Sequence, residues 1–383
     1  MQEQYRLNSI SERQIKDAMN ILHLEYSGNT GGIEKLCKDI GVNARNDKHY
    51  FVFIHEGGIF YDLMKEAGLN VICLGFENKD IIKLYNAIKE LTNEKRIDAI
   101  IIHHPSPLVW LSMLLYLKLS HEAKVVVYVH NVYDEITKHS LARKSVYNEL
   151  LKKCDGAIAI SEFVKKTIVE HANIPENKVK IIYNGVECPN PVKLHNGNLN
   201  NPVKIIYVGR LIEKKGVQVL LNAIERLKDK NSYEVQIIGD GPYRAELEKL
   251  SNRLQIECCV RFYGNQSNVK EWLERADIFV HPAIWQEGFG ITIAEALSYG
   301  KICIASNRGA IPEIIESKKN GFLFEAEDSD TLANIIKYVC STMSKEQRLE
   351  IQKNAVERAR DFSIEKLMQQ LHEYLLFLKG REE

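Results

Sequence analysis

The segment from His281 to Gly300, HPAIWQEGFGITIAEALSYG, carries residues suited to holding an anion. Gly290 precedes a helical apolar pattern, and Glu287 and Glu295 are eight positions apart. A helix start exposes unpaired backbone N–H groups and carries about half a positive charge. Glycine lets a phosphate approach those groups closely. We expect a phosphate at this helix start, with Glu295 reaching a ribose hydroxyl pair and Glu287 facing a sugar. The alternative is a surface helix glutamate at Glu295 and a capping residue at Glu287.

A second segment, Val203–Gln218, places cations after a buried strand. Its sequence VKIIYVGRLIEKKGVQ predicts a strand that ends before Arg210 and a loop that carries Lys215 to the next helix. Two cations at the carboxyl edge of a sheet suit a diphosphate leaving group, because they stabilise its developing negative charge. The alternative is that Arg210 and Lys215 are ordinary loop cations.

Short apolar runs alternate with helical patterns along the whole chain, which is typical of a parallel sheet covered by helices. Ligands of such sheets bind beyond the carboxyl ends of the strands. The predicted strands are Asn20–Tyr26, Tyr50–His55, Val71–Leu74, Ala99–His103, Lys124–His130, Gly156–Ile160, Val179–Ile182, Val203–Val208, Glu234–Ile238, Val260–Tyr263, Ile278–His281, Ile302–Ala305 and Gly321–Phe324.

The 383 residues are enough for two cores, and the segment Glu187–Pro202 has the composition of a linker. We therefore predict two doubly wound α/β domains, over residues 1–190 and 203–362. Residues 363–383 form a final helix and tail that cross back to the N-terminal domain. The predicted helices are Gly32–Val42, Ile59–Ala67, Asp80–Thr92, Ser140–Cys154, Gly216–Leu227, Pro242–Leu254, Asn268–Ala276, Gly290–Tyr299, Asp330–Cys340 and Ile364–Lys379.

The amino-acid composition argues against several classes of protein. The 51 basic residues equal the 51 acidic ones, which argues against a nucleic-acid partner. The eight cysteines show no CxxC pair and no zinc-like spacing with histidine, so a reduced, cytoplasmic protein is expected. The polar start of the chain is no signal peptide, and the apolar stretch Ile100–Leu119 is broken by two prolines, which indicates a strand, a turn and a helix.

A modest group of basic residues falls on two predicted helices. We interpret it as a solvated helix surface; the alternative is peripheral contact with the anionic lipids of a membrane, where each basic residue contributes about 1 kcal/mol. The group comprises Arg143, Lys144, Lys152, Lys153, Lys165 and Lys166.

The ordered motifs resemble the retaining family-four glycosyltransferases of GT-B fold. The resemblance covers the chain from about Asn20 to its last helix, and the ordered set is specific although no single motif is. The C-terminal half carries GRLIEKKG, GDGPYRAELE, RFYG, the segment His281–Gly300, GAIPEII and NGFLF. The N-terminal half carries GGIEKL at Gly31–Leu36, VHN at Val129–Asn131, AIAISEFVK at Ala157–Lys165 and YNGVE at Tyr183–Glu187.

This resemblance implies two Rossmann-like domains facing a central cleft, with the N-terminal one on the acceptor side and the C-terminal one holding a nucleotide-sugar donor. It implies that Arg210 and Lys215 contact the donor diphosphate, Glu287 the sugar hydroxyls and Glu295 the ribose. Phe289, Gly290 and Ile291 would present backbone amides to the sugar and phosphate. Gly31 and Gly32 would approach the diphosphate, and His130 would lie near the transferred sugar. Many relatives have aspartate where this chain has Asn131, which leaves that position without an assigned role.

The resemblance further implies metal-independent hexosyl transfer without a cofactor, with retention at the anomeric carbon. The donor would be a UDP-sugar and the acceptor a glycan or a lipid-linked sugar at the inner face of the membrane. Surface polysaccharide, capsule or lipopolysaccharide assembly is the expected process. A front-face displacement is preferred, because no carboxylate in these motifs takes the role of nucleophile.

Three alternatives remain at the level of the sequence. A nicotinamide-dependent dehydrogenase is disfavoured because the loop Gly28–Gly32 does not match G-x-G-x-x-G. A sugar-nucleotide epimerase of related fold and a non-catalytic partner subunit stay open.

For the other polar residues of note we expect structural roles. His23 is expected to be packed and hydrogen-bonded, and His103 and His104 to be loop histidines, with a place on the acceptor side as their alternative. Asp328 and Ser329 precede a helix as capping residues, so no metal is assigned to them.

Overall fold

The computed structural model describes residues 18–29 and 31–380, and the chain divides into two compact units. Unit 1 runs to Asn184 and resumes at Ile364, and unit 2 is Gly185–Ser363. Each unit is an α/β domain built on a parallel sheet, so the predicted pair of Rossmann-like domains is confirmed. The segment Glu187–Pro202, predicted as a linker, lies within unit 2. Its Cys188 thiol donates to the Ala359 carbonyl, which ties the segment to that unit.

The sheet of unit 1 has seven strands in the order β3-β2-β1-β4-β5-β6-β7. Several of its strands are continuous runs of β-branched residues, as expected for parallel strands buried on both faces. The strands are β1 (Asn20–Ser27), β2 (Lys48–Glu56), β3 (Asn70–Cys73), β4 (Ala99–Ile102), β5 (Lys124–Val129), β6 (Gly156–Ala159) and β7 (Val179–Ile181).

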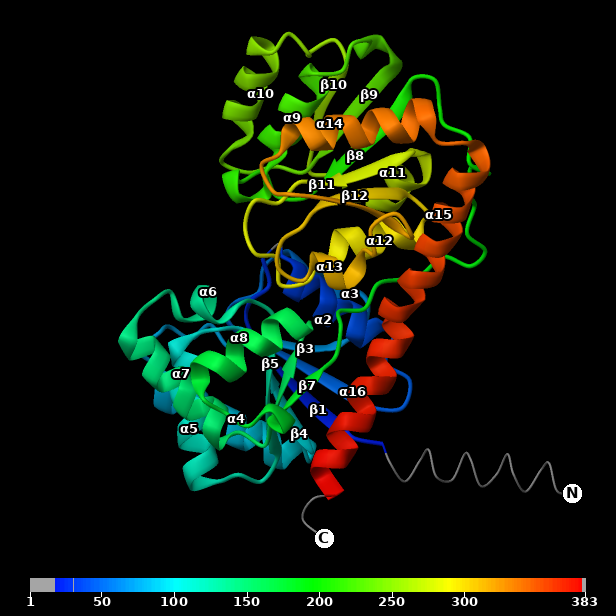
Figure 1. Ribbon diagram of the computed structural model, residues 1–383. Coiled ribbons are helices and arrows are strands. Elements are labelled where there is room, and N and C mark those ends of the chain that lie inside the picture. The colour runs from blue at the N-terminus through cyan, green and yellow to red at the C-terminus, as the bar shows by residue number, and fades with distance from the viewer. Residues whose placement is uncertain (1–17, 30, 381–383) are drawn as a thin grey trace, which may run out of the picture. The chain divides into compact units, whose positions relative to one another are not determined.

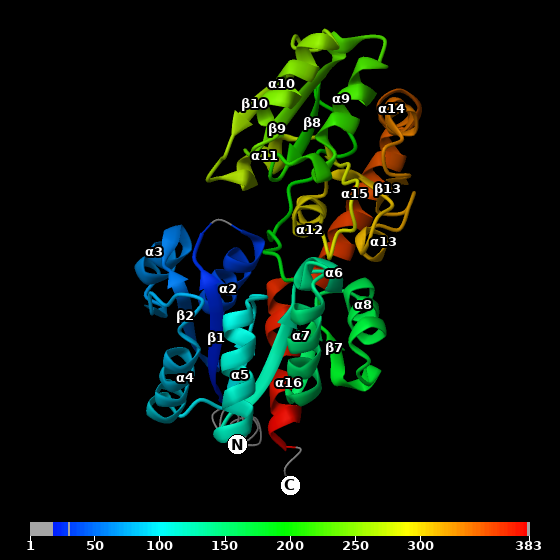
Figure 2. The same ribbon diagram turned by 90° about the vertical axis from the view of Figure 1, so that its left-hand side faces the viewer.

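Helices cover this sheet, and the last of them comes from the end of the chain. The packed pair α4 and α5 is visible in Figure 2. The helix α16 belongs to unit 1, where the Tyr374 hydroxyl donates to the carbonyls of Ala157 and Lys178. The helices of unit 1 are α2 (Gly32–Val42), α3 (Gly58–Glu66), α4 (Ile81–Lys95), α5 (Pro107–Leu119), α6 (Tyr133–Thr137), α7 (Leu141–Lys153), α8 (Glu162–Ala172) and α16 (Ile364–Lys379).

Unit 2 repeats this architecture with a six-stranded sheet in the order β10-β9-β8-β11-β12-β13. Its strands are β8 (Val203–Val208), β9 (Tyr233–Ile238), β10 (Val260–Gly264), β11 (Ile278–His281), β12 (Ile302–Ser306) and β13 (Gly321–Phe324). Its helices are α9 (Val217–Glu225), α10 (Arg244–Arg253), α11 (Val269–Arg275), α12 (Ile291–Ser298), α13 (Ile311–Ile314), α14 (Ser329–Lys337) and α15 (Lys345–Ala359).

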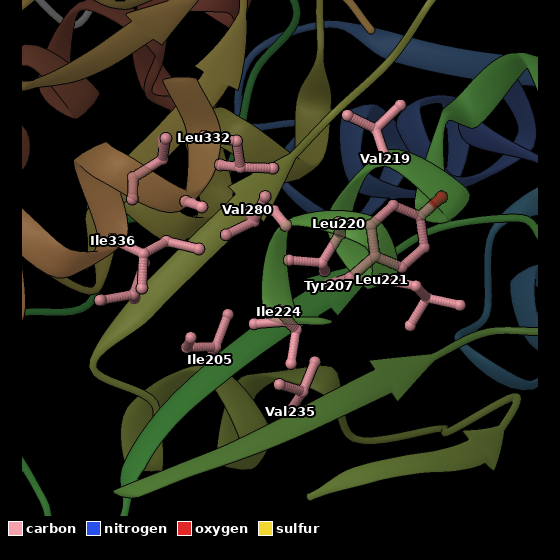
Figure 3. Packing of buried hydrophobic residues seen from close by; sticks show 14 of the residues in the cluster. Ile205, Tyr207, Val219, Leu220, Leu221, Ile224, Val235, Val280, Leu332 and Ile336 are labelled. Atoms are coloured by element: carbon pink, nitrogen blue, oxygen red, sulfur yellow. The ribbon is translucent and has the colours of Figure 1, made fainter. Parts of the chain in front are cut away.

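The core of unit 2 lies between its sheet and the amphipathic helices α9 and α14. Figure 3 shows Leu220 and Ile224 of α9 and Ile336 of α14 gathered over Ile205 and Val280 of the sheet, all five fully buried. Burial of such a side chain contributes about 1.5–3 kcal/mol relative to exposure. This packing holds the strands rigidly and so positions the loops at their carboxyl ends.

The thirteen predicted strands are all present, with ends within two residues of those predicted. The helix α8 is the second of the two helices predicted to carry the basic residues, whereas α15 is absent from the prediction although its start is marked in the sequence. Ser161 caps α8, and Ser344 with Gln347 forms a complete capping box on α15. Asp328 caps α14 by accepting from the Thr331 N–H, in agreement with its interpretation as a capping residue.

No helix in the described part of the chain is both long and apolar enough to cross a membrane. Several basic residues of α7 and α8 form ion pairs with acidic neighbours. Lys144 Nζ lies 3.3 Å from Asp134 Oδ1, and Lys165 Nζ lies 3.1 Å from Glu176 Oε1. Lys153 and Lys166 pair along their own helices with Glu149 and Glu170. Membrane contact by this surface stays a prediction.

Candidate active site

Each sheet has one point where the strand order reverses, and the candidate residues follow the strands that flank it. In unit 2 this switch point lies between the paired neighbours β8 and β11. Ligands of open α/β sheets bind outside the carboxyl ends of the strands at such a point. The loop after β8 carries Arg210 and Lys215, and the loop after β11 carries Glu287.

Glu287 is the centre of a buried polar cluster in unit 2. Three donors converge on its Oε1 atom: Lys215 Nζ at 2.5 Å, Trp285 Nε1 at 3.1 Å and His281 Nε2 at 3.2 Å. The residue is only 6% exposed. Lys214 lies on the indole of Trp285, with its Nζ 4.7 Å from the ring centroid. Of the predicted residues, the structure therefore brings Lys215 and Glu287 into direct contact.

This environment keeps the Glu287 carboxyl ionised. Burial alone raises the pKa of Glu287, but the Lys215 ammonium and the hydrogen bonds from His281 and Lys215 lower it by more. The net result is a pKa well below the usual range for glutamate. The three donors all reach Oε1, so Oε2 can accept hydrogen bonds from a ligand.

Two glycines allow the surrounding loops to nest around this cluster. Gly216 begins α9 with φ 72°, and a Cβ there would lie 1.9 Å from the Pro282 carbonyl oxygen. Gly309 has φ 58°, and a Cβ there would lie 2.2 Å from the Glu287 carbonyl oxygen. That oxygen also accepts from the Ala310 N–H at 2.9 Å. Three loops thus meet through backbone contacts that a side chain would block.

The helix that follows Glu287 begins without a side-chain cap. Gly290 is the N-cap residue of α12 and, having no side chain, provides no side-chain cap, in contrast to Ser344, which caps α15. The first backbone N–H groups of α12 thus receive no bond from the side chain of the cap, and Ile291 is its first residue. Glu295 lies one turn further on and is partly buried.

Two further predicted residues of unit 2 differ in exposure, since Phe289 is buried and Arg210 is exposed. The Phe289 ring is buried in an edge-to-face contact with Phe362, so only its backbone is suited to a ligand. Arg210 is exposed, and its guanidinium makes no ion pair with a described residue. Its carbonyl oxygen accepts from the Tyr207 hydroxyl at 3.2 Å. The structure therefore positions the backbone of Arg210 but does not join its side chain to the Glu287 cluster.

In unit 1 the switch point lies between β1 and β4. Gly31 is the N-cap of α2, again without a side-chain cap, and Gly32 is the first helical residue. His130, directly after β5, is 9% exposed and stacks on Tyr128 with ring centroids 4.5 Å apart. Each of these predicted residues thus lies at the carboxyl edge of the sheet.

His130 ends a chain of four hydrogen-bonded histidines. His49 Nδ1 is 2.8 Å from His23 Nε2, and His23 Nδ1 is 2.8 Å from His103 Nε2. His103 Nδ1 then lies 3.0 Å from His130 Nε2. The interpretation of His23 as a packed, hydrogen-bonded residue is confirmed. His103 begins the loop after β4, as expected of a loop histidine, but it is 2% exposed and bonded on both ring nitrogens, which the sequence did not indicate.

Burial keeps these imidazoles neutral. It lowers the pKa of His130 to about 3 and that of His49 to about 4, and the pKa values of His23 and His103 also lie well below the usual one. His104, the next residue of the loop that His103 begins, stacks on Tyr26, with ring centroids 5.1 Å apart.

Sequence reasoning missed His49 as a member of this chain and Glu25 and Cys37 as its buried neighbours. Glu25 and Cys37 are fully buried, and the Cys37 thiol donates to Glu25 Oε1 at 2.5 Å. Strands β1 and β2 read as apolar runs interrupted by polar residues, and those interruptions were the available signal.

Two family profiles match consecutive parts of the chain. Glycosyltransferase Family 4 matches residues 30–188, and Glycosyl transferases group 1 matches residues 194–358, so together they match well over half of it. The chain belongs to the GT-B glycosyltransferases. The resemblance to family-four glycosyltransferases of GT-B fold is thereby confirmed, and retention at the anomeric carbon stays a prediction.

Individual relatives of this glycosyltransferase agree with the assignment. A 41.2 kDa protein from the cps region of Klebsiella pneumoniae is 26% identical over 336 residues, 83% of this chain and 89% of that one. The amylovoran biosynthesis glycosyltransferase AmsK of Erwinia amylovora is 30% identical over 225 residues, 56% and 54% of the two chains. The crystal structure of Anabaena Alr3699/HepE in complex with UDP superposes with a TM-score of 0.81 at 23% identity, over 94% of this chain and all of that one.

The nesting of Gly309 against Glu287 gives a first prediction. Gly309→Ala adds a Cβ that collides with the Glu287 backbone in addition to the strain of a left-handed residue, which costs about 1–2 kcal/mol. Gly75→Ala is a matched control, because Gly75 has φ 68° and open space around its Cβ. We expect the fall in melting temperature for Gly309→Ala to be at least about twice that for Gly75→Ala. Equal falls would show that the loop of Gly309 does not constrain Glu287.

The pKa of Glu287 gives a second prediction. Its folded pKa lies below the unfolded value of 4.5, so its ionised form stabilises unit 2 above pH 4.5, and this stabilisation is lost as the pH falls further. Glu287→Gln lacks this contribution. The difference in melting temperature between the wild type and Glu287→Gln should therefore be constant from pH 7 to about 5 and narrow below pH 4.5. A difference that stays constant down to pH 3 would contradict a depressed pKa.

Proposed function

We propose that this glycosyltransferase moves a hexose-type sugar from a UDP-sugar to a glycan or lipid-linked acceptor in surface polysaccharide biosynthesis, with retention at the anomeric carbon. The observation that carries the proposal is the buried Lys215–Glu287–His281 cluster directly before the glycine-capped start of α12. A nucleotide-sugar donor needs a site for a diphosphate beside a site for sugar hydroxyls, and this edge of unit 2 offers groups for both.

The start of α12 suits the diphosphate. Gly290 has no side chain that could accept from the first N–H groups of the helix, and the positive end of the helix dipole lies at the same place. Arg210 is exposed on the neighbouring loop, and Lys215 is held near Glu287. In this proposal these cations and the helix supply the charge that stabilises the leaving diphosphate, and no metal ion is assigned to that role.

Glu287 suits the sugar. It is an ionised acceptor with Oε1 saturated and Oε2 directed to no other member of its cluster. Hydrogen bonds from neutral hydroxyls to a carboxylate are charge-assisted and stronger than those between neutral groups. Glu295, one turn into α12, is proposed for the ribose, and the backbone of Phe289, Gly290 and Ile291 for the sugar and phosphate.

Unit 1 contributes His130, proposed to lie near the transferred sugar, and two glycines proposed for the diphosphate. His130 stands at the carboxyl edge of β5, and burial keeps its imidazole neutral. Gly31 and Gly32 begin α2 without a side-chain cap and are proposed to approach the diphosphate. In a front-face displacement the departing phosphate oxygen helps to remove the proton of the acceptor hydroxyl, so no enzyme nucleophile is required.

The choice of donor and process rests on the relatives. Alr3699/HepE has been solved with UDP and with UDP-glucose, which supports a UDP-sugar for the shared fold. The similar proteins AmsK and WcaL are described for amylovoran and colanic acid biosynthesis, and another lies in a cps region. These descriptions support an extracellular polysaccharide as the product.

Removal of the Lys215 charge tests the catalytic role. Lys215→Met should lower turnover by about 10²–10³-fold, the effect typical of losing one well-placed transition-state donor. Lys214→Met is the matched control, since Lys214 lies on the Trp285 ring and not on Glu287, and its loss should cost less than about tenfold. The paired variant Lys215→Met/Glu287→Gln removes both charges and so avoids an unpaired buried carboxylate. Wild-type turnover in Lys215→Met would remove the residue from the mechanism.

A thermal-shift series tests the donor. UDP at 100 times its dissociation constant should stabilise the protein by about 2.7 kcal/mol, and GDP, ADP and NAD should give smaller shifts. Glu295→Ala should lose most of the UDP shift if Glu295 holds the ribose. A shift with NAD alone would contradict the proposal. Sugar rearrangement of the donor in the absence of any acceptor would favour an epimerase.

A further inference from the structure

A second polar cluster lies inside unit 1 and is independent of the proposed function. It consists of His23 and Glu25 on β1, Cys37 on α2 and His103 directly after β4, and we name it the β1–α2 cluster. Donor atoms of His23, Cys37 and His103 all lie within 4.8 Å of one another. Three of its members have no exposed surface, and His103 is 2% exposed.

The parallel register explains how the strands bring these residues together. His23 pairs with Ile101 across β1 and β4, so His103 lies level with Glu25, two residues further toward the carboxyl edge. Residues two apart in a strand point to the same face, which puts the three side chains of these strands on one face of the sheet. Cys37 of α2 meets that face, with its Sγ 2.5 Å from Glu25 Oε1.

Hydrogen bonds within the cluster leave it incompletely satisfied. His23 and His103 share one hydrogen bond of 2.8 Å, and the thiol of Cys37 is a weak donor. Glu25 Oε2 is buried without a hydrogen-bond partner among the described residues. A buried carboxyl oxygen without a partner costs about 1–3 kcal/mol, so a ligand that bonds to this oxygen would stabilise the cluster.

The chemistry of the donors matches one class of ligand. Imidazole nitrogen, thiolate sulfur and carboxylate oxygen are the three ligand types of tetrahedral zinc. Two neutral imidazoles, one thiolate and one carboxylate carry a total charge of −2. A divalent cation therefore makes the buried group neutral overall, whereas a monovalent ion would leave a buried charge.

We propose that the β1–α2 cluster is a structural site for a divalent cation of the zinc class, held by His23, Cys37 and His103, with the Glu25 carboxylate turning from its contact with Cys37 to become the fourth ligand. On binding, the Cys37 thiol and the Glu25 carboxyl each release a proton to solvent, and four ligand bonds replace the hydrogen bonds between these side chains. Two nitrogens each about 2.05 Å from a tetrahedral zinc ion lie about 3.3 Å apart. The present separation of 2.8 Å between His23 Nδ1 and His103 Nε2 thus needs to open by only about half an ångström.

The outer histidines complete the arrangement. Imidazoles that ligate zinc usually donate their second ring N–H to a neighbouring acceptor, which orients the ring. His23 and His103 each have such a neighbour, His49 Nδ1 at 2.8 Å and His130 Nε2 at 3.0 Å. With the ion bound, His103 donates to His130 and so fixes the tautomer of His130, with its proton on Nδ1.

The test measures the metal directly on the full chain, without a histidine tag and kept reduced. After dialysis against a zinc buffer, mass spectrometry of the elements should find about one zinc per chain. Replacement by Co²⁺ should give a thiolate-to-cobalt charge-transfer band. Cys37→Ser should lose both signals. The control Cys154→Ser should keep them, because Cys154 is a buried thiol of unit 1 whose hydrogen bonds within the described residues go to the carbonyls of Leu151 and Gly156.

Two further variants keep the result decisive if Cys37→Ser does not fold. Glu25→Gln should weaken zinc binding, and His49→Gln, which changes only the outer partner of His23, should weaken it by about 10–100-fold. A wild-type chain that takes up no zinc overturns the proposal and leaves a hydrogen-bonded histidine core. Zinc that remains undiminished in Cys37→Ser, with no charge-transfer band in the wild type, also overturns it because the ion then binds elsewhere.

Discussion

The buried charge of Glu287 is the constraint on which the loops at the carboxyl edge of the unit 2 sheet depend. Moving an ion out of water costs several kcal/mol, so the chain must surround this carboxylate with a cation and hydrogen-bond donors. Lys215 comes from the loop after β8, and His281 comes from the end of β11. The loops can meet only where Gly216 and Gly309 leave room for neighbouring carbonyls. The buried carboxylate therefore requires both the backbone conformation of these glycines and the packing of the loops that carry its donors.

Much of the fold was predictable because it depends on local sequence. Buried parallel strands are short β-branched runs, and amphipathic helices have a 3.6-residue period, so both are visible in a single chain. The places of Lys215 and Glu287 were predictable because a motif puts each in the loop that follows a strand. The helix α15 was missed because its apolar pattern is weak, although the capping box at Ser344 marks its start. The histidine chain was out of reach because it depends on which strands become neighbours.

The two units use the same architecture for different interiors. In unit 2 the space beneath the helices is filled by aliphatic side chains such as Leu220 and Ile336. In unit 1 a line of imidazoles crosses one face of the sheet, each step moving one strand over and toward the carboxyl edge, from His49 to His130. Each of these imidazoles needs its hydrogen-bond partner in place, because an unpaired polar group is costly in the low dielectric of the interior.

The return of α16 to unit 1 makes that unit discontinuous in the sequence. Unit 2 is one uninterrupted segment, Gly185–Ser363, whose two ends are joined by a bridge between Val186 and Ser363 and by a hydrogen bond from the Val186 N–H to the Phe362 carbonyl. In topological terms unit 2 is an insertion into unit 1, and the chain enters and leaves it at neighbouring positions, Val186 and Ser363. A recombination event that replaces this one segment exchanges the whole of unit 2, including the Glu287 cluster, while the sheet of unit 1 and its closing helix stay intact. Such an exchange offers a simple route by which one scaffold acquires a new second domain.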